Sequence, residues 1–298
     1  MTTLPNNIDS NSLFITTQPN SNQEARNSIF QGKVLHLSST ASSRLLVDTV
    51  YELLHKNLGQ NPRKAERTMS ESDFFRVMGA IRKELYTSSA YHQLLRDCIA
   101  DLGFDNEHVA FDPLRLRIIN HDGHENPLAA PVYYPHRDIW YGHPASLITW
   151  WIPLDDLLPE ETFYFYPDKF QVPVPNSSHI FDYQTWVSKG WDLKIGWQRV
   201  AEEDRLQYPG VIGDPERGTS VGFSCTRGDN ILFAGAHFHA TRPQSLHKTR
   251  FSLDFRVVDL RDIETGNHAP SVDDNSTGKA LVDYIQPGQI TWTNSTVV

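Results

Sequence analysis

The stretch that decides the fold begins at Gly228 and reads GDNILFAGAHFHATRPQSLHKTRFSLDFRVVD. Gly228-Asp229 predicts a turn, and the apolar residues after it predict a strand over 230–234. A second strand is expected over 249–259, where four apolar residues alternate with polar ones: Phe251, Leu253, Phe255 and Val257 with Ser252, Asp254 and Arg256. Successive side chains of a strand point to opposite faces, so this strand should have one apolar and one polar face.

A second informative motif, His136-Arg137-Asp138, precedes this stretch by about a hundred residues. On an extended strand, residues two apart point the same way, so an imidazole and a carboxylate would share one side. A histidine from the later stretch would complete a set of two histidines and one carboxylate. Non-haem Fe(II) oxygenases use this set and leave positions open for co-substrate and O₂. Arg250, on the following strand, could clamp a dicarboxylate beside such a metal.

The same three letters, HRD, also begin the catalytic loop of protein kinases. Here the motif is followed by Ile-Trp-Tyr-Gly-His, with no asparagine at the required place, no DFG and no glycine-rich loop. The kinase interpretation is therefore rejected. Taken alone, His136 could still be a core histidine and Asp138 a turn residue.

Helical patterns occupy the first third of the chain after residue 30. Three apolar faces have helical spacing, and a glycine closes the first and the third: Leu46, Val50, Leu53 and Leu54 before Gly59; Phe74, Phe75, Met78, Ile81 and Leu85; and Leu94, Leu95, Cys98 and Leu102 before Gly103. Strands are expected afterwards, over 114–119 and 146–154. Helices first and strands later predict a mainly β fold of the α+β class, a jelly-roll barrel supported by helices.

Two segments differ from this core in composition. Residues 1 to about 30 are rich in Asn, Ser, Thr and Gln and predict a flexible arm. Residues 176 to 220 carry Trp186, Trp191 and Trp197 with weak periodicity, which indicates a long insertion over the barrel mouth. Long loops in compact domains are often lids, although a packed surface loop is the alternative. Residues 31 to 298 are thus expected to form a single domain.

Composition limits the partners of the chain. Its 298 residues, 39% of them hydrophobic, suffice for a large core, and the net charge of −9 argues against nucleic acid or an acidic membrane surface as partner. Cys98 and Cys225 are expected to be buried free thiols. Neither a signal peptide nor an apolar run of membrane-spanning length is apparent, so a cytoplasmic protein is expected.

Together the motifs resemble those of the Fe(II)/2-oxoglutarate-dependent oxygenases, and in particular the phytanoyl-CoA dioxygenase-like branch. The resemblance covers roughly residues 110 to 260 and rests on the H-x-D motif, the turn-strand-His segment and the Arg-x-Ser that follows. It implies a double-stranded β-helix (jelly-roll or cupin-like) fold, Fe(II) as metal, and 2-oxoglutarate and O₂ as co-substrates. One departure is Tyr166-Pro167-Asp168-Lys169, where many relatives have a Pro-Gly-Ser-His-like turn.

The resemblance also implies roles for single residues. His136, Asp138 and His239 would be the metal ligands and catalytic centre; His237 competes for the third place, but His239 fits the step to the arginine better. Related halogenases lack the carboxylate, so Asp138 favours oxygenation. Arg250 would pair with the distal carboxylate of 2-oxoglutarate. Further cofactor contacts are expected from four residues: Thr241, Ser252, Thr149 and Arg117, with Arg115 as an alternative to the last. The arginine could hold the substrate instead of the keto-acid end, or simply face the surface.

Substrate contacts are expected around the barrel mouth, from Asn120, His121, His124, Tyr134, Trp140 and Tyr141. The expected substrate is a small-molecule metabolite, as in natural-product biosynthesis, with tailoring of mycosporine-like amino acids as one setting. Hydroxylation, dealkylation and desaturation remain equally open. The competing hypotheses are a cupin-like, metal-dependent non-redox enzyme, a small-molecule binding protein and a protein-modifying hydroxylase. Arg250 argues against the first two, because neither needs a clamp for 2-oxoglutarate.

Overall fold

The computed structural model describes residues 13–126, 129–194, 208–215 and 218–293. Its helices are α2 (Asn22–Phe30), α3 (Ala41–Leu58), α4 (Ala65–Thr68), α5 (Glu71–Thr87), α6 (Ser89–Asp101), α7 (Tyr183–Lys194) and α8 (Leu260–Thr265). Its strands are β1 (Phe14–Ile15), β2 (Val34–Leu37), β3 (Val109–Phe111), β4 (Arg115–Ile119), β5 (Ile148–Pro153), β6 (Phe163–Phe165), β7 (Asn230–Ala234), β8 (His239–Thr241) and β9 (Arg250–Asp259). The α+β class expected from the sequence is confirmed.

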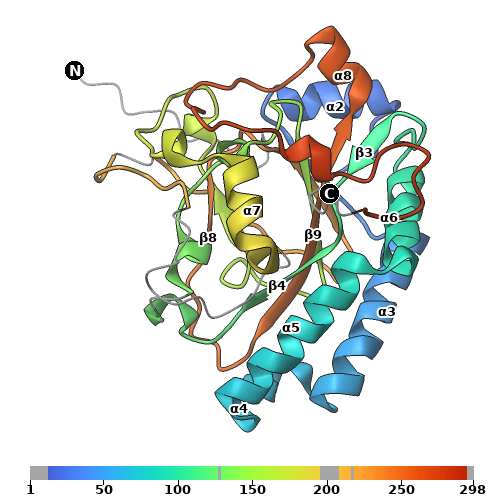
Figure 1. The fold of residues 1–298 in the computed structure, drawn as a ribbon, viewed down its shortest axis with the longest axis vertical. Coiled ribbons are helices and arrows are strands. Elements are labelled where there is room, and N and C mark those ends of the chain that lie inside the picture. The colour runs from blue at the N-terminus through green and yellow to red at the C-terminus, as the bar shows by residue number, and fades with distance from the viewer. Residues whose placement is uncertain (1–12, 127–128, 195–207, 216–217, 294–298) are drawn as a thin grey trace.

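The predicted helical faces form α3, α5 and α6. The α3 helix begins where the Thr40 hydroxyl accepts a hydrogen bond from the Ser43 amide, and it ends at Gly59, whose φ of 84° suits glycine. Its apolar stripe packs in the main core with those of α5 and α6. These three helices lie along one flank of the long strand β9 (Figure 1).

The larger sheet has seven strands in the order β1-β2-β7-β5-β9-β3, with β4 also paired to β9. Except for the parallel pair β1–β2, neighbouring strands are antiparallel. The expected alternation along β9 is confirmed: the apolar residues Phe251, Leu253, Phe255 and Val257 join the main core on the helical side. The polar residues Arg250, Ser252, Asp254 and Arg256 are buried too, on the opposite face. The sheet therefore presents a buried polar surface away from the helices.

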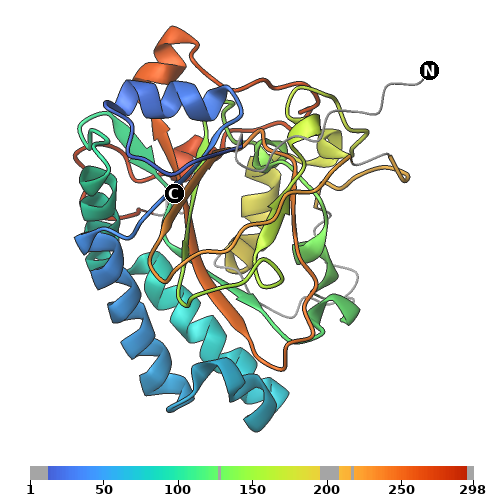
Figure 2. The same ribbon diagram turned by 180° about the vertical axis from the view of Figure 1, so that it is seen from behind.

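The smaller sheet pairs β6 with β8. Single bridges extend it, from His136 to His239 on one edge and from Phe165 to Val221 on the other. Seen from behind, α7 lies on the side of the strands away from the viewer (Figure 2). The strand pairings of the described residues do not join the two sheets into one closed barrel.

The N-terminal arm expected over residues 1 to about 30 needs a correction. Residues 1–12 lie outside the described residues, but β1 and α2 are ordered. In α2, Ala25, Ile29 and Phe30 are buried, and Arg26 forms ion pairs of 2.9 Å with Asp259 and 2.6 Å with Asp262. The polar composition concealed a short amphipathic helix, because its few apolar residues share one face.

In the described part of the 176–220 insertion, α7 packs against the body of the protein. Phe181, Tyr183 and Val187 are buried, and the Tyr183 hydroxyl donates to Asp283 over 2.7 Å. The side chains of Trp191 and Trp197 lie outside the described residues.

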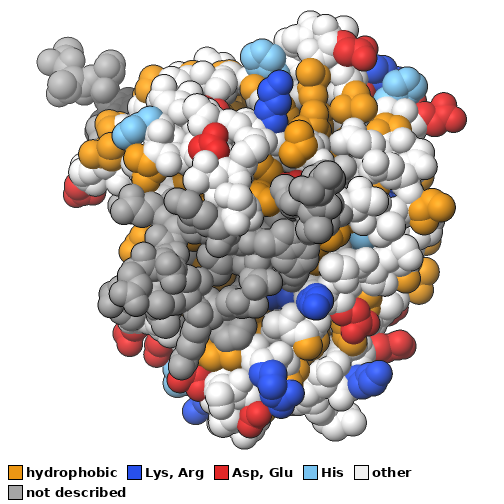
Figure 3. Space-filling view, viewed as in Figure 1, with side chains coloured by type: hydrophobic (Ala, Val, Ile, Leu, Met, Phe, Trp, Pro, Cys, Tyr) orange, Lys and Arg blue, Asp and Glu red, His pale blue; other side chains and the backbone are white. Residues whose placement is uncertain are grey.

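On the face shown in Figure 3, acidic and basic side chains are interspersed around the rim. No helix of the described residues has the length and apolarity needed to span a membrane.

Candidate metal centre

His136 and His239 are brought together by the edge of the smaller sheet. Their backbones exchange two hydrogen bonds, of 3.0 and 3.1 Å, and their ring centroids lie 4.5 Å apart. Asp138 starts a short 3-10 helix, Asp138–Tyr141, and its Oδ1 lies 3.5 Å from Nε2 of His136. One potential ligand atom from each of the three residues lies within 4.8 Å of the others.

The local conformation of this motif differs from the expected extended strand. The chain leaves the strand geometry after Arg137, and Asp138 reaches the cluster from the 3-10 helix. The side chain of Arg137 is fully buried and donates to Asp273 over 3.0 Å and to the carbonyl of Ala236. The intervening arginine therefore anchors the ligand loop to the C-terminal segment.

Both histidines are oriented by backbone carbonyls. Nδ1 of His136 lies 2.8 Å from the carbonyl oxygen of Tyr134, and Nδ1 of His239 lies 2.9 Å from that of His237. A carbonyl can only accept, so each Nδ1 carries a proton and Nε2 is the nitrogen left for a metal. Burial, followed by the charge of His136, lowers the pKa of His239 to about 4, so its ring is neutral at pH 7.

Asp138 is buried and ionised. Burial works to raise its pKa, but His136, His239 and the hydroxyl of Thr149 outweigh burial and hold the pKa well below its usual range. Thr149 donates to Oδ2, which leaves Oδ1 facing the histidines. Nη2 of Arg256 lies 4.0 Å from the same Oδ1. Cis ligands of an octahedral ion are roughly 3 Å apart, since the metal–ligand bonds are about 2.1 Å long, so the three donors fit a small divalent metal.

His237 takes no part in this cluster. Its ring nitrogens lie 3.1 Å from the carbonyl of Ala234 and 3.2 Å from that of Gly32, and its ring packs against Phe165 and Phe170. Of the two candidate histidines, His239 is thus the one that the structure groups with His136 and Asp138.

Arg250 is a buried cation without an acidic partner among the described residues. Its Nη1 donates to the Ser252 hydroxyl over 3.0 Å, its guanidinium lies 5.7 Å from the ring centroid of Trp151, and its Nε has no partner. Burial lowers its pKa to about 10, which still leaves it charged at pH 7. A buried, unpaired guanidinium is costly unless an anion joins it.

An aromatic chain links Arg250 to the metal cluster. The Trp151 ring that faces Arg250 meets Phe163 at 5.2 Å, and Phe163 meets His239 at 5.8 Å. The ring separations are those of edge-to-face packing. The metal cluster and the unpaired arginine thus border the same aromatic wall.

The other expected cofactor residues occupy different settings. Ser252 accepts from Arg250 and from the Trp151 indole, the latter over 2.9 Å. Thr241 lies at the end of β8 and is partly buried. The Thr149 hydroxyl donates a hydrogen bond to Asp138, and the Arg117 guanidinium donates two to Asp254. Arg115 is paired with Asp112.

The expected substrate residues differ in their distance from the metal cluster and in their burial. Tyr141 lies beside the cluster, with its ring 5.7 Å from that of His136. Trp140 does not line a mouth: it is fully buried and its indole donates to Asp273 over 2.8 Å, so that expectation is corrected. In a 3-10 helix these adjacent side chains diverge, which sends Trp140 into the core.

The remaining candidates lie near the start of β9 or at the surface. Asn120 accepts a hydrogen bond of 3.3 Å from Thr249, the neighbour of Arg250. The His121 ring packs on that of His247 at 4.2 Å, and Tyr134 is 53% exposed. His124 belongs to a group with Asp122 and Glu125 that could also offer metal ligands, but none of the three is buried.

The sequence did not predict the contacts of three polar residues around the cluster. Asp254 and Arg256 were recognised only as the polar face of a strand, and Thr149 was not expected to brace Asp138. A signal for the first two existed, because charged residues alternating with a fully apolar set are unusual on a central strand unless the polar face borders a site.

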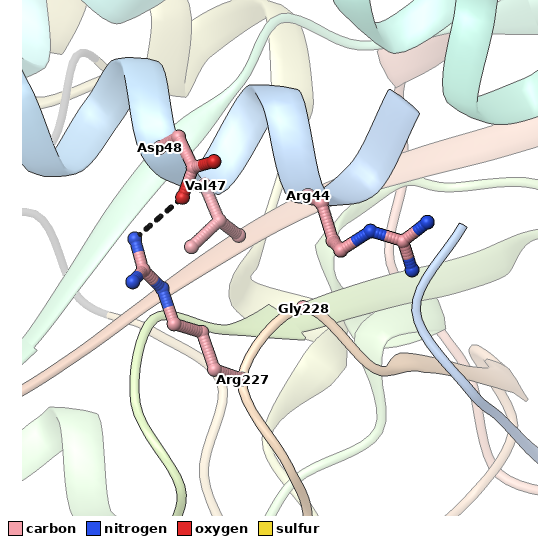
Figure 4. A pocket seen from close by; sticks show the side chains of 5 residues that line it. All are labelled: Arg44, Val47, Asp48, Arg227 and Gly228. Carbon is pink, nitrogen blue, oxygen red and sulfur yellow. Dashed lines mark hydrogen bonds and ion pairs between the residues drawn. The ribbon is translucent and has the colours of Figure 1, made fainter. Parts of the chain in front are cut away.

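A separate surface pocket lies between α3 and the turn before β7. It is lined by Arg44, Val47, Asp48, Arg227 and Gly228, and an ion pair of 2.8 Å joins Asp48 to Arg227 (Figure 4). Both arginines are engaged, since Arg44 donates to Ser39. The pocket contains no residue of the metal cluster, and we assign it no function.

Comparison with protein-family models gave no match, and comparison with curated proteins gave none either. Solved structures do match. EvdO2 from Micromonospora carbonacea var. aurantiaca, complexed with 2-oxoglutarate, is 12% identical over 82% of this chain and 94% of that one, with a TM-score of 0.47. The epimerase SnoN, in complex with Fe³⁺, alpha ketoglutarate and nogalamycin RO, is 13% identical over 79% and 83%, with a TM-score of 0.41. The non-heme monooxygenase ThoJ is 11% identical over 74% and 71%, with a TM-score of 0.40. Because these scores are below 0.5, we base the function on the geometry of the site alone.

Proposed function

We propose that this protein is an Fe(II)/2-oxoglutarate-dependent oxygenase that oxidises a small-molecule metabolite. The observation that carries the proposal is the combination of two histidines and one ionised carboxylate with a buried arginine that has no acidic partner among the described residues. Two histidines and one carboxylate are the ligand set of non-haem iron oxygenases. The arginine supplies the charge that the distal carboxylate of 2-oxoglutarate would neutralise.

The fold proposed with this function is a double-stranded β-helix of the phytanoyl-CoA dioxygenase-like kind. In support, β8 of the smaller sheet carries His239, and β9 of the larger sheet carries Arg250. The polar face of β9 is buried on the side away from the helices, where the interior of such a barrel would be. The 176–220 insertion is proposed as its cover, because Phe181 lies 5.6 Å from Tyr141 beside the metal cluster.

Each residue then has a defined task. His136, Asp138 and His239 would hold Fe(II) through Nε2, Oδ1 and Nε2, with Thr149 fixing the carboxylate. Arg250 and Ser252 would hold the distal carboxylate of 2-oxoglutarate, and Thr241 of β8 is proposed as a further donor. When bound, the iron and 2-oxoglutarate supply O₂ activation coupled to oxidative decarboxylation. The chain itself positions the substrate and excludes water, since aromatic rings line the region between Arg250 and His239.

A metal-dependent hydrolase or a binding protein on a similar barrel would leave Arg250 unexplained. Neither needs a buried guanidinium whose Nε lacks a partner. Hydroxylation, dealkylation and desaturation share the same residues, and all three belong to the proposal, as does a setting in natural-product biosynthesis.

The test is an anaerobic titration of the Fe(II)-loaded protein with 2-oxoglutarate, followed by the visible charge-transfer band of the complex. Arg250→Ala should weaken 2-oxoglutarate binding roughly ten- to a hundredfold, because a hydrogen bond to a charged group contributes about 1.5–3 kcal/mol. Fe(II) affinity should change little. Arg76→Ala is the matched control, since this arginine is exposed on α5.

Absence of any band in the wild-type protein at saturating Fe(II) and 2-oxoglutarate would refute the proposed function. An unchanged titration in Arg250→Ala would keep the metal centre and move the clamp to another cation.

A further inference from the structure

A second arginine, Arg117, lies on the polar face of the larger sheet. It pairs with Ser252 in the register of β4 and β9, on the same sheet face as Arg250 and Asp254. Its Nε and Nη2 donate to Asp254 over 2.9 and 2.8 Å. The side chain is nevertheless 40% exposed, and Nη1 has no partner among the described residues. Within the described residues, one N–H edge of this partly exposed guanidinium is therefore left to bind another group.

The surroundings of Arg117 hold more arginines than carboxylates. Its partner Asp254 also lies 3.9 Å from Arg256, and Arg256 in turn shares Asp112 with Arg115. In this chain of contacts three guanidinium groups share Asp254 and Asp112, and Arg256 also lies 4.0 Å from Asp138, the carboxylate that the proposed function assigns to the metal. Burial and the nearby charge of Arg117 lower the pKa of Arg82, on α5, to about 9. An additional anion would be stabilised here.

The second donor is the hydroxyl of the half-buried Tyr141, for which the described residues show no hydrogen-bond partner. Burial and the charge of Asp138 raise the pKa of Tyr141, and Arg117 is close enough to oppose this shift. The ring lies 5.7 Å from that of His136, 5.6 Å from Phe181 and 6.3 Å from Tyr208. Tyr141 thus joins the metal cluster to an aromatic group on the insertion.

We propose that Arg117 and Tyr141 bind a carboxylate of the substrate, and that the rings of Tyr141, Phe181 and Tyr208 pack on its apolar or planar body. The substrate class is therefore a carboxylic acid that carries an unsaturated or ring-shaped group. The inference rests on the proposed function, because His136, Asp138 and His239 would supply the reacting centre. The site is distinct from that of Arg250, whose cation is assigned to the co-substrate.

The geometry favours a carboxylate as the recognised group. A guanidinium that already fixes one carboxylate through Nε and Nη2 is held rigid and can offer Nη1 without further loss of side-chain freedom. A hydroxyl adds a second directed hydrogen bond, which a planar carboxylate can accept on its other oxygen.

The experiment measures binding of two acids, phenylacetate and indole-3-acetate, against their primary amides. Calorimetry is performed on the anaerobic protein loaded with Fe(II) and 2-oxoglutarate, and again on the metal-free protein. Each acid should bind at least tenfold more tightly than its amide, which has the same shape without the charge. Arg117→Leu should weaken acid binding roughly ten- to a hundredfold, and Tyr141→Phe several-fold. The matched control Arg76→Leu should not change it.

The 2-oxoglutarate titration of the same variants separates the two proposals. An unchanged titration in Arg117→Leu with lost acid binding supports the inference. If Arg117→Leu weakens 2-oxoglutarate binding as much as acid binding, Arg117 serves the co-substrate and the inference is wrong. It is equally wrong if neither acid binds or if amides bind as well as acids. Tyr141→Phe, which removes one oxygen only, decides the matter should Arg117→Leu not fold. Failure of the proposed function appears separately, as a missing Fe(II)·2-oxoglutarate band in the wild type.

Discussion

At the scale of single residues, the hydroxyl of Thr149 determines which oxygen of Asp138 is free to meet a metal. Thr149→Val keeps the shape of the side chain and removes this donor, so Asp138 can rotate. We expect Fe(II) affinity to fall roughly ten- to a hundredfold, the usual cost of losing a partner that orients a ligand. Thr149→Ser keeps the hydroxyl and should bind metal nearly as the wild type does. Equal metal affinity in the Val and Ser variants, measured by competition with a chelating dye, would contradict this role.

The histidines of the AHFHA segment provide a matched pair of variants. His239→Ala should abolish Fe(II) binding, because it removes one of the three ligands. His237→Ala should keep the metal but unfold at lower denaturant concentration, since its buried ring packs against Phe165 and Phe170. Metal content and urea unfolding of the two proteins, measured side by side, check this. The reverse pattern would show that the wrong histidine has been assigned.

At the scale of elements, helix α2 is fixed to the sheet by a buried cation. Arg26 is 3% exposed and contacts Asp259 at the end of β9 and Asp262 in α8. Arg26→Leu would leave these carboxylates with fewer partners, and breaking a buried pair costs about 3–5 kcal/mol. We therefore expect a large drop in the free energy of unfolding, measured with urea. Arg76→Ala, a change of an exposed residue on α5, should alter it by less than about 0.5 kcal/mol. Similar values for both variants would mean that α2 is only loosely attached.

At the scale of the whole molecule, buried neutral histidines make stability depend on pH. Burial lowers the pKa of His143, His237 and His239 to about 4, whereas an unfolded histidine titrates near 6.5. Between these values the unfolded chain binds more protons than the folded one, so stability is full above about pH 6.5 and falls as the pH drops towards 4. The loss can reach roughly 3 kcal/mol for each histidine. Urea midpoints of the metal-free protein at pH 7.5, 6 and 5 should decrease in that order, and equal midpoints would contradict the prediction.

Much of the fold followed from periodicity in the chain. The apolar spacing around Leu46, Met78 and Leu95 predicted α3, α5 and α6, and the alternation from Arg250 onwards predicted β9 with two unlike faces. The helix α2 could not be predicted, because its apolar face is short and because Arg26 forms its ion pairs with residues more than two hundred positions away.

From the sequence alone come the kinds of groups at the candidate site: two histidines, one aspartate and an arginine on the next strand. Which of them meet was decided by tertiary structure, because burial and carbonyl contacts depend on residues distant in the chain. The ring nitrogens of His237 lie against the carbonyls of Gly32 and Ala234, while the backbone pairing of His239 with His136 brings the rings of these two histidines together. Likewise, only the folded chain shows that Trp140 faces the core. It also shows that Arg117 donates two hydrogen bonds to Asp254, and that Arg250 is buried without an acidic partner in the described residues. Side-chain direction at a bend, and the charge that surrounds a buried group, are set by packing across the whole molecule.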